Sequence, residues 1–288
     1  MNERARRGAG RRRTIRLGPV FVGAVLAIAL ASAACGGSDP AAQGDRPITV
    51  ATFNIHHGRG VDERRDLARI ARVIRESGAD IIGLQEVDRH FDRRSEFQDQ
   101  LTVLGGLLDM HVAFVRTLQL PPIVPGEPLR QYGNAVLTRY PIARSSEEAL
   151  PFDAGSEPRG ALLATIDAPG GPLHVAVSHL GVTSSAERER QAAALRSALG
   201  PSPSRTVVLA DVNAEPGSDE ARALSRGLTD AWPAVDDGPG LTFPATGPTR
   251  RIDHVLVSPD LRVLSARVPP GDAADHLPVV VDVDSVSD

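Results

Sequence analysis

The stretch ADIIGLQEVD at residues 79–88 decides how this chain folds. Its apolar residues predict a buried strand over 80–84, and Glu86 follows shortly after that strand. An earlier apolar run predicts another strand at 48–55. Between the two strands, apolar side chains recur at helical spacing before a glycine, at Leu67, Ile70, Ala71, Ile74 and Gly78. The start of the domain is therefore predicted to be a β-α-β unit.

The rest of the chain has the pattern of antiparallel pairs. Apolar runs separated by turn residues predict hairpins, and a capped helix is predicted from Ser184 to Leu199. The predicted strands of this part lie at residues 135–139, 161–166, 173–178, 206–210, 252–257, 261–268 and 279–283. Mixed strands with few helices predict an α/β fold in which two mixed sheets pack face to face and are flanked by helices.

Polar side chains stand at or beside the ends of these predicted strands. They are Asn54, Gln85, Glu86, His179, Asp211, Asn213, Asp253, Asp275 and His276. A single Asp or Asn at such a place is usually a turn former. So many together predict a shared site, because loops at strand ends are where a rigid sheet holds catalytic groups.

The chemistry of these side chains points to a hard divalent cation. Carboxylate and amide oxygens without cysteine are ligands for Mg²⁺ or Mn²⁺. The single cysteine excludes an internal disulfide and every zinc or iron–sulfur site built from several cysteines. His179 and His276 can transfer protons near neutral pH. A cation, a proton acceptor and polar donors together are the equipment for hydrolysis of a phosphate ester.

The remaining histidines are predicted to be packing or surface residues. His56 and His57 are adjacent, and adjacent side chains of an extended chain point in opposite directions, so no metal site is expected at this pair. The others are His90, His111, His174 and His254.

Eight stretches, taken in their order along the chain, resemble the endonuclease/exonuclease/phosphatase family. They are TFNIHHG (52–58), ADIIGLQEVD (79–88), YGNAVLTRYPI (132–142), PRGALL (158–163), HVAVSHL (174–180), VVLADVNAEP (207–216), RIDHVLVS (251–258) and DHLPVVV (275–281). The chain departs from the family pattern at Ala210, Val212 and Ala274, which shape turns and supply no ligand. The resemblance implies a four-layer α/β sandwich with the site at one edge of the two central sheets.

The same resemblance implies roles at the metal and the attacking water. Glu86 would be the principal metal-binding carboxylate, with Asn54 beside it at the metal or phosphate. Asp275 would lie near the metal. Asp211 and Asn213 would orient the nucleophilic water and the phosphate.

It also implies roles in proton transfer and substrate binding. His276, hydrogen-bonded to Asp253, would act as a base or stabilise phosphate charge. His179 would stabilise the developing oxyanion or protonate the leaving group. The expected substrate contacts are Asn54, Arg159, Tyr132 and Asn134.

The first 34 residues resemble a bacterial export signal. An arginine-rich start precedes an uncharged apolar run at 17–34, and small residues stand directly before the single cysteine, Cys35. Residues 1–34 are therefore predicted to be a lipoprotein signal, Cys35 the lipidated residue and 35–46 a flexible tether. The alternative is an uncleaved anchor helix. The catalytic domain is predicted at 47–284, lipid-anchored to the cell membrane on its extracytoplasmic side.

The charge of the domain bears on its substrate. The chain has a net charge of −4, and its first 16 residues hold seven arginines against one acid, so the rest is more acidic. An acidic domain repels polyanions, which makes nucleic acid the less favoured partner. We expect a monomeric, Mg²⁺- or Mn²⁺-dependent phosphodiesterase or phosphatase that acts on a phospholipid or a small phosphodiester. The alternatives are a nuclease on extracellular DNA or RNA and a non-catalytic lipoprotein that keeps the fold as a binding module.

Overall fold

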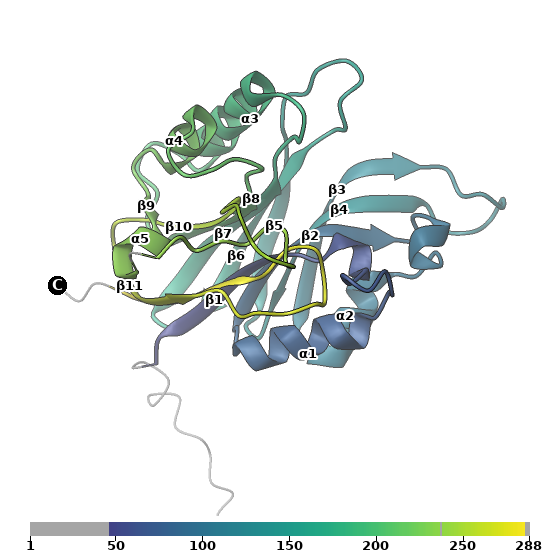
Figure 1. Cartoon of the computed structure of the whole chain (residues 1–288), viewed down its shortest axis with the longest axis horizontal. Coiled ribbons are helices and arrows are strands. Elements are labelled where there is room, and N and C mark those ends of the chain that lie inside the picture. The colour runs from purple at the N-terminus through teal and green to yellow at the C-terminus, as the bar shows by residue number, and fades with distance from the viewer. Residues whose placement is uncertain (1–45, 237, 286–288) are drawn as a thin grey trace, which may run out of the picture. The chain divides into compact units, whose positions relative to one another are not determined.

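The computed structural model of the chain describes residues 46–236 and 238–285 (Figure 1). The predicted signal at 1–34, the predicted lipidation site Cys35 and residues 36–45 of the predicted tether lie outside these ranges. Within them, none of the helices is both long enough and apolar enough to cross a membrane.

Two six-stranded sheets form the centre of the domain. The first has the order β11 (Leu261–Arg267), β12 (Val279–Ser285), β1 (Ile48–Asn54), β2 (Ile81–Arg89), β4 (Arg130–Thr138) and β3 (His111–Leu120). The second has the order β5 (Ile142–Ala149), β6 (Gly160–Ala168), β7 (Gly171–His179), β8 (Thr206–Asp211), β10 (Asp253–Val257) and β9 (Thr229–Asp230). Both sheets are mixed, because β1 is parallel to β2 and β7 is parallel to β8, whereas the other neighbours are antiparallel.

Apolar side chains fill the space between the two sheets. Successive side chains of a strand point to opposite faces, so Val50 of β1 and Ile81 of β2 belong to the cluster between the sheets, whereas Ala51 and Ile82 pack on the outer side. The sheets approach each other closely at Gly83, where a Cβ would lie 2.8 Å from the Cβ of Leu209. This position of β2 therefore has no room for a side chain.

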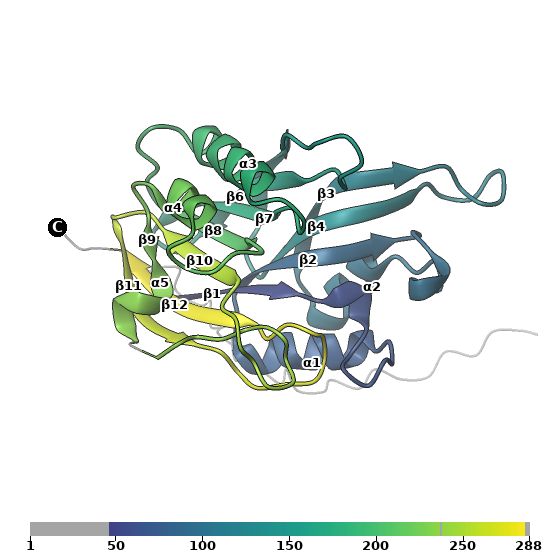
Figure 2. The ribbon, with the colours of Figure 1, turned by 45° about the horizontal axis from the view of Figure 1, so that its top comes forward.

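Helices cover the outer face of each sheet (Figure 2). The first sheet packs against α1 (Leu67–Ser77) and α2 (Gln100–Leu108), and the second against α3 (Ser185–Ala198) and α4 (Asp219–Ser225). A short helix, α5 (Ala231–Val235), lies beside β10 and β11. The order helices, sheet, sheet, helices confirms the expected four-layer α/β sandwich.

The second strand departs from its sequence prediction. The strand predicted over 80–84 extends to Arg89, so Glu86 lies inside β2 rather than after its end. Its pairing with β4 is interrupted between Leu84 and Val87, and Glu86 has a φ of 60°. A bulge of this kind redirects a side chain, and here it presents Glu86 at the edge where other polar residues gather.

The strand register brings polar side chains together in each sheet. In the first sheet Asn54 lies opposite Gln85. In the second, Asp211 has His179 opposite it on β7 and Asp253 opposite it on β10. Three neighbouring strands of one sheet thus present their polar residues at the same level.

Candidate active site

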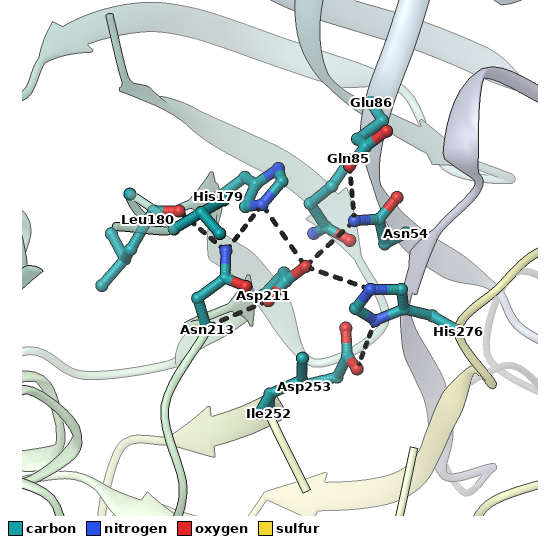
Figure 3. Close-up of polar contacts among 12 residues, drawn as sticks. Asn54, Gln85, Glu86, His179, Leu180, Asp211, Asn213, Ile252, Asp253 and His276 are labelled. Carbon is teal, nitrogen blue, oxygen red and sulfur yellow. Dashed lines mark hydrogen bonds and ion pairs between the residues drawn. The ribbon is translucent and has the colours of Figure 1, made fainter. Parts of the chain in front are cut away.

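Asn54, at the end of β1, connects the two sheets at the site (Figure 3). Its Nδ2 donates hydrogen bonds to Asp211 Oδ2 at 3.0 Å and to Glu86 Oε1 at 3.2 Å. Its Oδ1 accepts a hydrogen bond from the backbone N of His56 at 3.0 Å. The amide therefore holds a carboxylate of the second sheet beside one of the first. The predicted contact of Asn54 with metal or phosphate remains a prediction.

His276 lies between two carboxylates. Its Nδ1 is 2.9 Å from Asp253 Oδ2, and its Nε2 is 3.7 Å from Asp211 Oδ2. All three side chains are buried, and the ring of Phe243 packs on the imidazole with 4.8 Å between the ring centroids. The expected contact between His276 and Asp253 is present, and Asp211 joins the pair.

The proton in this group belongs to the imidazole. Burial acts to lower the pKa of His276, but the charge of Asp253, its hydrogen bond and the charge of Asp211 raise the pKa to about 10. Burial, followed by the charge of Asp253, raises the pKa of Asp211 above the usual carboxyl range. A carboxylate with a raised pKa is the better proton acceptor. Of the two roles expected for His276, the geometry favours stabilisation of phosphate charge, and Asp211 is the candidate base.

His179, at the end of β7, is buried and contacted at both ring nitrogens. Its Nδ1 lies 3.2 Å from Arg159 Nη1, and its Nε2 lies 2.9 Å from Asn213 Nδ2 and 3.4 Å from Asp211 Oδ2. Burial first, and the charge of Arg159 second, hold the pKa of His179 well below its usual value. A neutral imidazole can donate a hydrogen bond to an oxyanion but is a weak acid. Of the two roles expected for His179, this favours stabilisation of the oxyanion over protonation of the leaving group.

Glu86 and Asp275 are the more accessible carboxylates of the site. Glu86 Oε2 lies 3.8 Å from His57 Nδ1, and Asp275 Oδ1 lies 3.6 Å from His56 Nδ1. Burial acts to raise the pKa of Glu86, but the contacts with His57 and Asn54 and the nearby histidines together hold that pKa below its usual range. Glu86 is therefore an anion.

The remaining substrate candidates differ in their surroundings. Arg159 reaches the site through its contact with His179, and its buried Nε has no hydrogen-bond partner. Tyr132 is buried on β4, where burial and then the charge of Glu86 raise its pKa well above the usual value. Asn134 Nδ2 donates to the backbone O of Gly160 at 3.0 Å, a bond between the two sheets. The amide of Asn134 is thus used in packing, whereas the other two side chains lie near the ionised groups.

Buried polar atoms without a hydrogen-bond partner gather at this place. Over the described ranges there are six such side-chain atoms, and all but Arg69 Nε surround the site: His56 Nδ1, His57 Nδ1, Arg159 Nε, Asp253 Oδ1 and Asp275 Oδ1. Buried polar atoms are otherwise nearly always paired. One ligand atom from each of Asp211, Asp253 and His276 lies within 4.8 Å of the others, and the same holds for His56, His57 and Glu86. The carboxylate oxygens at this edge and the nitrogens of His56 and His57 fit a divalent metal ion, whereas the protonated His276 offers no free lone pair.

The conformation of His56 and His57 corrects a sequence prediction. They begin a 3₁₀ turn, His56–Gly58, with φ values of 45° and 43°, so the chain is not extended here. Their ring centroids are 4.5 Å apart, and each ring lies beside a carboxylate of the site. No shared metal site was expected at this pair because the chain was taken to be extended, and two adjacent positive φ values cannot be predicted from residue types. One feature of the sequence could have placed the two histidines at the site: both follow directly after the strand that ends at Asn54.

The four-layer sandwich with a polar edge is the architecture that the resemblance implied, and the sequence agrees with it. The sequence profile of the endonuclease/exonuclease/phosphatase family matches residues 51–288. The chain belongs to the endonuclease/exonuclease/phosphatase family, as its eight stretches indicated.

Similar proteins support this assignment. The uncharacterized protein YbhP of Escherichia coli K12 is 30% identical over 218 residues, which cover 72% of this chain and 83% of YbhP. A solved endonuclease/exonuclease/phosphatase structure from Beutenbergia cavernae has 28% identity and a TM-score of 0.70, and the match covers 83% of this chain and 72% of that one. The mannosyl-6-phosphatase Bt3783 of Bacteroides thetaiotaomicron has 20% identity and a TM-score of 0.67 over 82% of this chain and 99% of its own, which shows the same fold.

Proposed function

We propose that this domain hydrolyses phosphate esters with the help of a divalent metal ion. The observation that carries the proposal is the buried network in which Asn54 joins Glu86 to Asp211 while Asp211 faces His276 and His179. It combines a candidate base, a cation and a neutral hydrogen-bond donor within a few ångströms. These are the groups that phosphoester hydrolysis requires.

The protein's own side chains divide the reaction between them. Asp211 accepts the proton of the attacking water, since burial and Asp253 raise its pKa toward that of an effective base. The His276 cation, held by Asp253, faces the negative non-bridging oxygens. His179 donates a hydrogen bond to the same oxygens, and Arg159 binds the phosphate.

Glu86, Asn54 and Asp275 are the residues that would hold Mg²⁺ or Mn²⁺. When bound, the ion neutralises charge on the phosphoryl oxygens. Glu86 is suited to this task because its pKa is low and its carboxylate is partly accessible, with 21% of the side chain exposed. Asp275 has an unpartnered buried oxygen on the same edge.

The substrate and the location are parts of the same proposal. The acidic charge of the chain supports a small phosphodiester or a phospholipid head group over nucleic acid. The export pattern before Cys35 supports a lipid-anchored enzyme on the extracytoplasmic side of the cell membrane.

A substrate panel with controlled metal tests the activity. Purified protein is assayed on bis(p-nitrophenyl) phosphate, p-nitrophenyl phosphate, sphingomyelin vesicles and plasmid DNA, in excess chelator and after addition of Mg²⁺ or Mn²⁺. We expect a phosphate ester to be cleaved only with metal, and Glu86→Gln to weaken activation by the metal. Asp211→Asn should lower turnover by about 10²- to 10⁴-fold, whereas Asp167→Asn, at an exposed position of β6, should not.

The outcomes separate the alternatives. Full activity in excess chelator would contradict the metal dependence. Preferential cleavage of plasmid DNA would favour the nuclease alternative, and no cleavage of any substrate under any metal would favour the binding module.

A further inference from the structure

The turn after β1 places the imidazoles of His56 and His57 beside the proposed metal site. A site built from oxygen ligands alone gives these two side chains no role. His57 is buried, with 6% of the residue exposed, and its Nδ1 has no hydrogen-bond partner. The Nδ1 of His56 also lacks one. Two adjacent non-glycine residues with φ near 45° form an uncommon backbone conformation, and such conformations concentrate at functional sites.

The distances around these nitrogens fit a shared ion. Two ligands bound to one ion at about 2.1 Å lie at most about 4.2 Å apart. The 3.8 Å between His57 Nδ1 and Glu86 Oε2 is within that limit, as is the 3.6 Å between His56 Nδ1 and Asp275 Oδ1. The ligand atoms of His56, His57 and Glu86 as a group lie within 4.8 Å of one another, so small side-chain movements would bring all three onto one ion. These distances exceed those of good hydrogen bonds, so each nitrogen has a carboxylate beside it without being satisfied by it. A cation among them would satisfy both kinds of ligand.

We propose that His56 and His57 are nitrogen ligands, together with Glu86, of a first-row transition-metal ion that this site binds in preference to Mg²⁺. The preference follows from ligand chemistry, because imidazole nitrogen suits transition metals, whereas Mg²⁺ prefers an octahedral shell of oxygens. The inference rests on the proposed metal-dependent hydrolysis and deepens it by naming the class of ion. His276 and its two carboxylates form a separate group.

Metal binding by the full chain tests the inference without reference to turnover. Equilibrium dialysis of Zn²⁺, Mn²⁺ and Mg²⁺ gives the three affinities, and pulsed electron paramagnetic resonance of bound Mn²⁺ detects ¹⁴N from an imidazole ligand. We expect the affinity for Zn²⁺ and Mn²⁺ to exceed that for Mg²⁺. The ¹⁴N coupling should be present in the wild type and in His276→Ala.

His57→Asn is the decisive variant, because asparagine tolerates a positive φ and keeps the turn. It should remove most of the ¹⁴N coupling when combined with His56→Ala. The affinity for Mn²⁺ should fall by about 10- to 100-fold or more, since even second-shell losses reach that range, while the affinity for Mg²⁺ changes little. His111→Ala, at the exposed start of β3, is the matched control and should bind like the wild type.

The results separate this inference from the proposed function. Mn²⁺ bound without ¹⁴N coupling, or with coupling that is lost only in His276→Ala, would overturn the histidine ligands even if metal-dependent hydrolysis is found. Nitrogen-coordinated Mn²⁺ with no hydrolysis of any phosphate ester would leave the metal site standing and would refute the enzymatic proposal.

Discussion

Asp253 governs the charge state of the residues next to it. Its carboxylate is buried beside His276, keeps that imidazole protonated and raises the pKa of Asp211 at the same time. In the proposed function, this one acidic side chain prepares a cation for the phosphate and a base for the water. Its own Oδ1 is buried without a hydrogen-bond partner.

His276→Ala should lower turnover by about 10²- to 10⁴-fold, because it removes the cation that faces the phosphate. Asp253→Asn should give a loss in the same range, since the imidazole then lacks its orienting carboxylate. Steady-state turnover of variants whose fold is checked by circular dichroism measures both. His111→Ala serves as the control, and full turnover in Asp253→Asn would contradict the coupling of these two residues.

A second buried pair lies outside the catalytic network. Arg251 donates hydrogen bonds to Asp230 at 3.0 and 2.7 Å, and the two side chains are 7% and 20% exposed. Burial acts to raise the pKa of Asp230, but His254 and Arg251 outweigh it and hold the pKa below the usual value. This pair therefore contributes stability while Asp230 is ionised.

Asp230→Asn should lower the free energy of unfolding by about 3–5 kcal/mol at pH 7, because Arg251 is left as an uncompensated buried charge. The pKa of Asp230 is lower in the folded protein than in the unfolded chain. The wild type therefore keeps the stability from the Asp230–Arg251 pair above the ordinary Asp pKa of about 3.9 and loses it as the pH falls below that value. Urea unfolding from pH 7 to about pH 3 should therefore show the two proteins converging in stability. A constant difference over that range would contradict the assignment.

The packing of β2 on β8 sets the spacing of the two sheets. Gly83→Ala should destabilise the fold by about 1–3 kcal/mol, because the new methyl group meets Leu209. Gly106→Ala in α2 is the matched control: a Cβ there meets nothing within 4 Å, and the change should stabilise the helix by about 0.4–1 kcal/mol. Thermal and urea unfolding of both variants measure the contrast. Equal effects would show that the sheets do not approach closely at Gly83.

Central elements could be predicted from the sequence, and so could the edge strand β11, but the edge strands β3 and β5 could not. Strand β1 is an almost wholly buried run, and helix α1 buries its apolar residues at helical spacing, so the pattern locates both to within a residue or two. Strands β3 and β5 lie at the ends of their sheets and have largely exposed or half-buried side chains. Their backbone is held by hydrogen bonds to one neighbouring strand. Backbone hydrogen bonds do not require particular residue types, so the sequence does not reveal these strands.

The same distinction applies to the site. Residues at the ends of regular strands, such as His179 and Asp211, could be placed because the strands themselves are predictable. Glu86 was recognised as a candidate, but the bulge that carries it was not. His56 and His57 were expected in an extended chain, whereas they stand in a turn with positive φ. The ends of regular strands can therefore be located from the sequence, and turns with positive φ cannot.

For the whole molecule, the proposed lipid anchor gives a direct test. Cys35→Ser should move the protein from the membrane pellet to the soluble fraction without lowering its specific activity, because Cys35 precedes every catalytic candidate in the sequence. Fractionation and an assay of each fraction measure this. A variant that stays in the pellet would indicate that the apolar run at 17–34 is kept as an anchor.

Glu86 of the first sheet meets Asp211 and Asp253 of the second at one edge of the sandwich, and Asp275 joins them from the loop before β12. The His276 cation offsets only part of this negative charge, so the carboxylates oppose folding until a divalent cation joins them. Binding of a metal ion should therefore raise the melting temperature by mass action. Replacement of one of these acids by a neutral side chain should raise the melting temperature as well, but should lower the activity. A screen for thermostable variants of this protein would enrich inactive ones.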